Sequence, residues 1–168
     1  MELFLLRHGP ALDRDPRRWP DDTLRPLSPD GVRSTRRSAR GLAGLVGEAD
    51  RLLTSPAVRA ARTAELFGEA LTGAPQLERW EELGPGEPAA GALERLRRTM
   101  RGRARVVVVG HEPQLSELLG LSVAGEALSI ARLAKAGAAA VEFPRAVTPG
   151  AGRLLWMLTR KQLARLGD

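Results

Sequence analysis

The sequence has no cysteine and no tyrosine, and its only lysines are Lys135 and Lys161. Without cysteine, the chain can form neither disulfides nor thiolate metal sites. No apolar stretch approaches the roughly 20 residues that a helix needs to cross a bilayer. The N-terminal apolar run is also too short for a signal peptide and carries an acidic residue where such a peptide is basic. These absences predict a cytoplasmic protein that does not bind membranes.

The net charge of +6 comes almost entirely from arginine. A basic surface can bind nucleic acid or another polyanion. Alternatively, arginine is simply the usual surface cation of this chain. We favour the second interpretation, because the arginines are spread over several segments and alternate with glutamate. The three phenylalanines and three tryptophans are too few for the stacking platforms of RNA-binding domains. No nucleic-acid partner is therefore expected.

The hydrophobic pattern predicts one α/β domain over residues 1–168. The runs LFLL (3–6) and VVVV (106–109) are continuous rather than alternating, as in parallel strands covered on both faces. Strands alternate with helical patterns, which indicates a three-layer sandwich with a mostly parallel central sheet flanked by helices. Further strands are expected at 51–54, 76–80, 138–143 and 153–159, and helices at 28–45 and 55–71, from 88 to 100, and from 113 onward.

The segment 11–27 has no periodicity and is rich in proline, aspartate and arginine. A loop this long in a compact domain is usually functional or mobile. Because it follows the first strand directly, we interpret it as a rim or lid. Trp19 within it is expected to anchor the loop on the body of the protein.

The chain contains only two histidines, and each follows a continuous apolar strand. Arg7-His8-Gly9 ends the first strand, and Gly110-His111-Glu112 ends the VVVV strand. Ligands of open α/β sheets bind beyond the carboxyl ends of the strands. If the two strands are parallel, both histidines share that edge, and we expect one site there rather than two unrelated structural histidines.

A third polar segment, LLTSPAVRAARTAE (52–65), joins a strand to a helix. Ser55 and Pro56 are typical of a helix start, where unpaired N–H groups favour anions. Arg59 follows within the first turns and can reach back toward the same edge. Ser55 is expected to cap the helix, although its position also permits contact with a ligand. Arg62 is expected to be solvated or to pair with Glu65 or Glu69.

Together, R-H-G, S-P-x-x-R-A-x-x-T and G-H resemble the motifs of the histidine phosphatase (phosphoglycerate mutase-like) superfamily. The short chain, RPLSPDG (25–31) and GHEPQLSELL (110–119) are similar to its SixA-type phosphohistidine phosphatases. The resemblance extends from Leu3 to the terminal LTRKQL. It implies that His8 is the nucleophile and forms a phosphohistidine intermediate. It also implies a phosphate pocket formed by Arg7, Arg59 and His111, with no metal and no cofactor.

The chemistry of these side chains fits those roles. A nucleophilic imidazole must be neutral, and a histidine pKa near ~6.5 leaves it largely neutral at pH 7. The second ring nitrogen must be held, and a backbone carbonyl near Gly9 is the expected acceptor. Arginine stays charged and offers a planar fork to phosphate oxygens. If a bound phosphate dianion protonates His111, its ring can donate a further hydrogen bond.

The general acid is less well defined by the sequence. Family members often place a carboxylic acid after a middle strand, and the corresponding stretch here is WEELGPGEP (80–88). Glu82 is the candidate, with Glu81 and Glu87 as alternatives. A phosphohistidine substrate reduces the need for such an acid, because its leaving nitrogen is more easily protonated than an alkoxide.

The sequence thus predicts a metal-independent phosphatase that transfers phosphate first to His8 and then to water. The expected substrate is a phosphohistidine on a signalling protein. A phosphatase for a small phosphoester is the alternative, and a mutase is disfavoured because the chain has no insertion to enclose a bisphosphorylated sugar acid. A noncatalytic module that binds phosphate or polyanions stays open as a third hypothesis.

Overall fold

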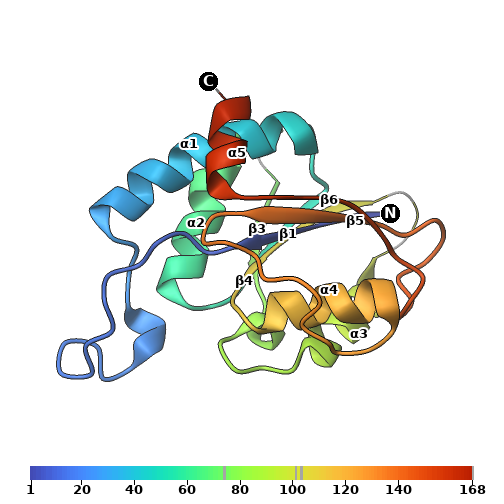
Figure 1. Cartoon of the computed structure of the whole chain (residues 1–168), viewed down its shortest axis with the longest axis horizontal. Coiled ribbons are helices and arrows are strands. Elements are labelled where there is room, and N and C mark those ends of the chain that lie inside the picture. Colours follow the sequence, from blue (N-terminus) through green and yellow to red (C-terminus); the bar gives the residue numbers. More distant parts are fainter. Residues whose placement is uncertain (74, 101, 103, 168) are drawn as a thin grey trace.

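A computed structural model describes residues 1–73, 75–100, 102 and 104–167. Its six-stranded sheet, in the order β3-β2-β4-β1-β5-β6, lies between two layers of helices (Figure 1). The three-layer α/β sandwich predicted from the sequence is therefore confirmed. The strands are β1 (Glu2–Arg7), β2 (Arg51–Thr54), β3 (Leu77–Arg79), β4 (Arg105–Gly110), β5 (Ala138–Glu142) and β6 (Arg153–Leu158).

The prediction of a mostly parallel sheet is also confirmed. β1, β2, β3 and β4 pair in parallel, whereas β5 is antiparallel to both of its neighbours, β1 and β6. The carboxyl ends of the parallel strands therefore lie at one edge of the sheet.

Helices cover both faces of the sheet. They are α1 (Pro29–Val46), α2 (Val58–Gly68), α3 (Ala89–Thr99), α4 (Gln114–Ala124) and α5 (Arg160–Leu166), with short 3₁₀ helices η1 (Asp22–Leu24) and η2 (Glu81–Leu83). As the sequence predicts, Ser28 caps α1 by accepting the Gly31 N–H, and Pro29 occupies its first turn.

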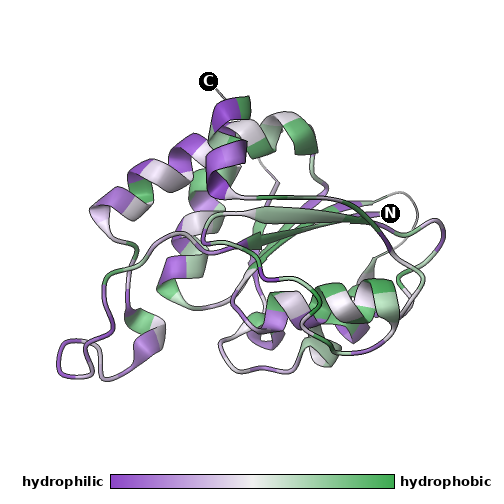
Figure 2. Cartoon of the chain, in the orientation of Figure 1, coloured by the Kyte–Doolittle hydropathy of each residue, from purple (hydrophilic) through white to green (hydrophobic). Residues whose placement is uncertain are grey.

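The strands supply two cores because successive side chains point to opposite faces. Leu3 and Leu5 of β1 face the layer that contains α3 and α4. Phe4 and Leu6 face the layer of α1, α2 and α5. Hydrophobic colour runs through the strands, while polar colour lies along the outer turns of α1 and α5 (Figure 2). The rigid sheet edge between these cores carries the site.

Apart from shifts of one residue at the ends of other elements, the structure differs from the sequence-based prediction at α2, β3 and α5. α2 begins at Val58, because Ser55 and Pro56 lie in the turn before it and Ala57 is its N-terminal flanking residue. The strand expected at 76–80 is limited to 77–79. The third element, α5, is not predicted from the sequence, because a seven-residue helix is too short to show hydrophobic periodicity. It starts with a Thr159–Gln162 capping box.

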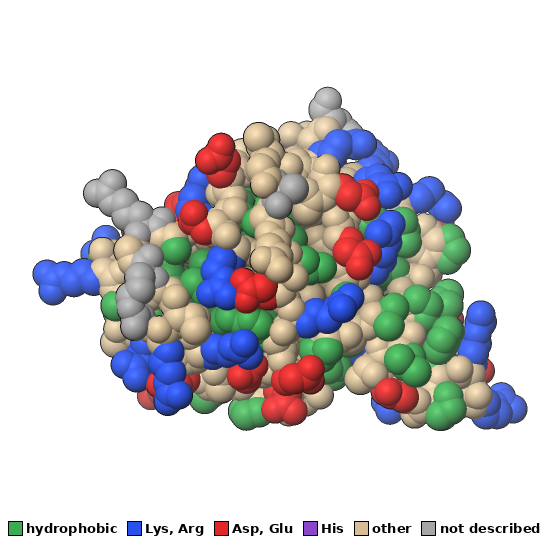
Figure 3. Space-filling view, turned by 180° about the vertical axis from the view of Figure 1, so that it is seen from behind, with side chains coloured by type: hydrophobic (Ala, Val, Ile, Leu, Met, Phe, Trp, Pro, Cys, Tyr) green, Lys and Arg blue, Asp and Glu red, His purple; other side chains and the backbone are tan. Residues whose placement is uncertain are grey.

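The distribution of charge agrees with arginine acting as an ordinary surface cation. On the face opposite to that of Figure 1, Lys and Arg side chains are interspersed with Asp and Glu (Figure 3). The pairs include Arg62 with Glu65 and Glu69, as expected from the sequence. Among the described residues, no helix is long and apolar enough to cross a membrane.

Candidate active site

Three neighbouring strands end at the same level of the sheet. Arg7 of β1 lies opposite Gly110 of β4, and Thr54 of β2 lies opposite Val109. The backbone pairing continues for one residue past the strands, since His8 N donates to Gly110 O at 3.1 Å and Ser55 N donates to Val109 O at 2.9 Å. The register therefore brings His8, Ser55 and His111 together, as the sequence predicts for the two histidines.

His8 is fixed at the end of β1 and is 7% exposed. Its Nδ1 lies 2.7 Å from the Gly9 carbonyl oxygen, the acceptor expected from the sequence. Because a carbonyl can only accept, Nδ1 carries the proton in the neutral ring, and Nε2 keeps its lone pair. Gly9 is required here, because a Cβ at this position would lie 2.1 Å from Thr35 Oγ1.

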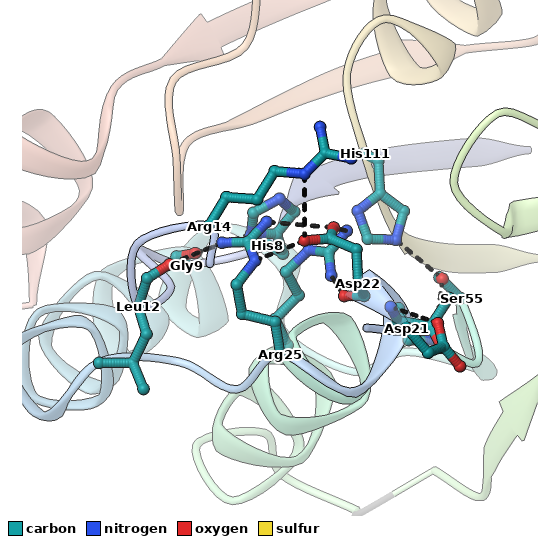
Figure 4. A network of polar contacts seen from close by, with 12 residues as sticks. His8, Gly9, Leu12, Arg14, Asp21, Asp22, Arg25, Ser55 and His111 are labelled. Carbon is teal, nitrogen blue, oxygen red and sulfur yellow. Dashed lines mark hydrogen bonds and ion pairs between the residues drawn. The ribbon is translucent and has the colours of Figure 1, made fainter. Parts of the chain in front are cut away.

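His111 lies beside His8, with the ring centroids 5.0 Å apart. Its Nε2 is 2.8 Å from Ser55 Oγ, and Figure 4 shows Ser55 and His8 on opposite sides of the ring. Its Nδ1 is buried without a hydrogen-bond partner among the described residues. Ser55 Oγ also accepts the Ala57 N–H at 3.2 Å. Ser55 therefore orients His111 and does not cap α2 as its N-terminal residue.

Arg7 approaches the site from the last position of β1. Its Nη1 donates to the Leu133 carbonyl oxygen at 2.7 Å. Its buried Nε has no partner within the described chain. Burial lowers the pKa of Arg7, opposed by the nearby Glu112 carboxylate, and an arginine remains charged at neutral pH despite such a shift.

Arg59 lies in the first turn of α2 and is 4% exposed. Its Nη1 donates to the Asp22 carbonyl oxygen at 2.6 Å, and its Nη2 lies 3.2 Å from Asp22 Oδ2. Its Nε is a second buried guanidinium nitrogen that has no partner among the residues described. Burial lowers the pKa of Arg59, opposed by Asp22.

The segment 11–27 forms the rim beside Arg59, in agreement with the rim or lid predicted from the sequence. Its η1 helix carries Asp22, whose carboxylate also pairs with Arg25 at 2.8 Å (Figure 4). The bonds to Arg25, with Arg59 and Arg14 nearby, hold the pKa of Asp22 below its usual range. Asp22 is not among the residues predicted from the sequence, because one acidic residue in a loop rich in charge gives no distinctive signal.

Two further residues position the site. Thr63 Oγ1 accepts the Gly9 N–H at 2.9 Å and donates to the Arg59 carbonyl oxygen at 2.7 Å. Glu112 Oε1 accepts the Leu133 N–H at 2.8 Å, which orders the segment whose carbonyl holds Arg7. Thr63 and Glu112 both occur within the motifs quoted above, but no role was predicted for them. Their roles depend on contacts with residues that are distant in the sequence.

Glu82, the predicted general acid, lies in η2 with its carboxylate 2.6 Å from Arg95 Nη1. Its own backbone N–H and Arg95 lower its pKa. A general acid at neutral pH needs a pKa near the working pH, so this environment does not favour the predicted role. The alternatives Glu81 and Glu87 are exposed.

Both histidines are neutral over the neutral pH range. Burial is the main cause that lowers the pKa of His8 to about 4, and the positive charges of Arg59 and Arg7 lower it further. The hydrogen bond to the Gly9 carbonyl opposes this only in part. Burial, the neighbouring His8 and Arg59 lower the pKa of His111 to about 3. A neutral imidazole with its lone pair on Nε2 is the form that can act as a nucleophile.

The lowered histidine pKa values predict a loss of stability in mild acid. An unfolded histidine titrates near ~6.5, so below this pH the unfolded chain binds protons that the folded chain excludes. The stabilisation is complete above pH ~6.5, and it decreases as the pH falls toward the folded values of about 4 and 3. Urea denaturation between pH 7 and pH 5 should show a free energy of unfolding that falls by more than ~1 kcal/mol.

The control is the His8→Asn/His111→Asn double variant, which lacks both groups. Its free energy of unfolding should change less over this interval. An equal slope in both proteins would show that the histidines do not cause the effect.

The comparisons with known proteins agree with this geometry. Residues 3–88 match the profile of the Histidine phosphatase superfamily (branch 1). The chain is 34% identical over 128 residues to the phosphohistidine phosphatase SixA of Escherichia coli K12, covering 75% of this chain and 76% of that protein. It is 35% identical over 138 residues to an uncharacterized protein of Picosynechococcus sp. PCC 7002, covering 82% of each. The chain belongs to the histidine phosphatase superfamily.

A solved structure of a histidine phosphatase has the same fold as this chain. The protein histidine phosphatase SixA in complex with tungstate superimposes with a TM-score of 0.83 and 29% identity, covering 97% of this chain and 99% of that one. The resemblance to SixA-type proteins noted in the sequence is thereby confirmed, and this similarity supports a phosphatase.

Proposed function

We propose that the protein hydrolyses phosphohistidine on a protein substrate, with His8 as the nucleophile and without a metal ion. The observation that carries the proposal is a set of buried nitrogens on three groups near His8: two arginines whose charges act on its ring and the neighbouring His111. Arg7 Nε, Arg59 Nε and His111 Nδ1 have no hydrogen-bond partner within the described chain. Buried donors are nearly always paired, so three unpaired ones beside a nucleophile are what a phosphoryl group would satisfy.

The first transfer would move the phosphoryl group from the substrate nitrogen to His8 Nε2. The substrate P–N bond breaks as the new P–N bond to His8 forms, and the leaving imidazole keeps the electron pair and takes up a proton from solvent water. Arg7 and Arg59 would neutralise the equatorial oxygens, which is the main requirement of phosphoryl transfer. The Gly9 carbonyl holds the Nδ1–H throughout.

The second transfer would move the phosphoryl group from His8 to water. A water oxygen bonds to phosphorus as the bond from phosphorus to His8 Nε2 breaks. Inorganic phosphate, which takes the oxygen and the protons of that water, and neutral His8 are released. His111 would contribute through Nδ1. If Ser55 donates its hydroxyl proton to Nε2, the ring proton resides on Nδ1, the nitrogen without a partner. The SixA structure is a complex with tungstate, a tetrahedral oxyanion like phosphate, and this supports a phosphate-binding role for the present chain.

The alternative substrate, a small phosphoester, has an alkoxide leaving group and needs a general acid. The pairing of Glu82 with Arg95 and its lowered pKa favour phosphohistidine, since they leave Glu82 ionised and unable to donate a proton at neutral pH. We expect Glu82→Gln to change kcat on a histidine-phosphorylated protein by less than about threefold, because general acid catalysis, where present, contributes about 10²-fold or more.

The test compares substrates in the wild type and in Glu82→Gln. The panel comprises a histidine-phosphorylated protein, phosphoramidate, p-nitrophenyl phosphate and sugar phosphates. The highest kcat/KM should be found for the phosphohistidine protein. A preference for one metabolite ester, together with a large loss of kcat in Glu82→Gln, would favour the small-molecule phosphatase. Salt-dependent polyanion binding without any hydrolysis would favour the noncatalytic module.

A further inference from the structure

A groove lined by three cations lies near the end of β1, the strand that leads into His8. It has a volume of about 710 Å³ and is lined by residues from four segments, including Pro10, Lys135, Arg160 and Lys161. Pro10 lies two residues after His8. Arg160 and Lys161 begin α5, which starts at the sheet edge where β1 ends (Figure 1). Both lysines of the chain therefore line one groove.

The backbone connects Lys135 to the active site. The Ala136 N–H donates to the carbonyl oxygens of Arg7 and His8, each at 3.1 Å. Ala136 has a φ of 55°, a conformation that side-chain-bearing residues rarely adopt. Such a turn is retained only when its surroundings fix it, and here it places Lys135 close enough for its charge to act on the His8 ring.

The groove continues along α1 and α5. A second hollow, of about 260 Å³, shares Ser34, Arg160 and Lys161 with the first and extends to Arg165. The two helices pack closely at Gly41 of α1. A Cβ at this position would lie 1.9 Å from the Leu163 carbonyl oxygen of α5. A rigid wall of this kind presents its charges without a large ordering cost on binding.

Three cations of the groove, Lys135, Lys161 and Arg165, differ from arginines elsewhere in the described chain that pair with carboxylates. Arg95 pairs with Glu82 and Arg51 with Glu78. In contrast, no carboxylate in the described part of the chain forms an ion pair with Lys135, Lys161 or Arg165. Asp30 is the single acidic side chain that lines the two hollows within the described residues, and it pairs with Arg33.

We infer that this groove binds an acidic segment of the phosphohistidine-bearing protein, next to the histidine that is dephosphorylated. The inference rests on the proposed function. The two connected hollows offer more room than one phosphoryl group needs, and their length along two helices suits a polypeptide. The unpaired cations would attract carboxylates, steer the encounter and lower KM.

The test uses three histidine-phosphorylated peptides of equal length, prepared with phosphoramidate. The four residues on each side of the phosphohistidine are all Glu, all Gln or all Lys. At low salt, kcat/KM should be at least tenfold higher for the Glu peptide than for the Gln peptide and lowest for the Lys peptide. The preference should weaken as salt is added.

The test variant is Lys161→Glu/Arg165→Glu, which should remove or invert the peptide preference. The matched control, Arg145→Glu/Arg153→Glu, makes the same change in charge; Arg153 begins β6, at the sheet edge opposite the site, and this variant should retain the preference. Lys135→Gln should reduce it without a charge reversal. Phosphoramidate has no flanking residues, so its hydrolysis reports on the phosphate pocket of each variant.

Each outcome has a distinct meaning. Equal kcat/KM for the three peptides would overturn the groove assignment and leave the proposed function intact. Equal losses in the test and control variants would show a general effect of net charge, and would also overturn it. Failure to hydrolyse any of the peptides, together with turnover of a doubly anionic metabolite ester, would refute the proposed function and the acidic protein partner.

Discussion

Replacement of His8 by alanine is expected to lower kcat by at least about 10⁴-fold, because no neighbouring group can substitute for the proposed nucleophile. His111 is the other imidazole within reach, but its Nε2 is engaged by Ser55. The wild type, mixed rapidly with radiolabelled phosphoramidate and quenched without acid, should carry label on His8. The quench must avoid acid because a P–N bond to imidazole hydrolyses at low pH.

The control for His8→Ala is rescue by added imidazole, which can occupy the cavity left by the ring. Partial recovery of turnover, without label on the protein, would show that the pocket is intact and that only the nucleophile is missing. A His8→Ala variant that turns over at the wild-type rate would exclude the covalent mechanism.

Replacement of Arg59 by alanine is expected to lower kcat/KM by about 10²–10³-fold, equivalent to about 3–4 kcal/mol of transition-state stabilisation. The charge that develops on the phosphoryl oxygens would lose a buried guanidinium that is 4% exposed. Arg7→Ala is expected to have a similar effect. Steady-state kinetics on phosphoramidate and on a histidine-phosphorylated protein would measure both losses.

Arg59→Lys serves as the matched control, since it keeps the charge but not the planar fork. It should recover part of the rate and stay well below the wild type, because lysine cannot form the bidentate contact. If Arg59→Lys and Arg59→Ala are equally impaired, geometry alone governs the contribution of Arg59. If Arg59→Ala retains wild-type kcat/KM, Arg59 does not contact the phosphoryl group.

The sequence predicted the sheet edge well because its signals are local. LFLL and VVVV are continuous apolar runs, and the two histidines follow them directly. Parallel pairing then aligns Arg7 with Gly110, so that two strand ends 103 residues apart along the chain meet. The Gly9 carbonyl was predictable for the same reason, since it is adjacent to His8.

The features of the site that were not predicted from the sequence depend on contacts between segments far apart along the chain. Asp22 is recognisable only from its proximity to Arg59, which lies 37 residues further along the chain. Leu133 contributes a carbonyl oxygen, which any residue type could supply. The lowered pKa of the Glu82 carboxylate reflects its own backbone N–H and Arg95, a residue on a different helix. α5 has a capping box but too few turns for an apolar stripe, so the groove beside it was not foreseen.

The rim that carries Asp22 also contains an indole that could report on its position. Trp19 lies in this segment with the Arg18 guanidinium 5.3 Å from its ring centroid. Since the chain has no tyrosine and only three tryptophans, its ultraviolet emission comes from very few chromophores. With Trp80 and Trp156 changed to phenylalanine, the remaining fluorescence would follow the rim alone, and stopped-flow mixing with vanadate would time its response to an oxyanion.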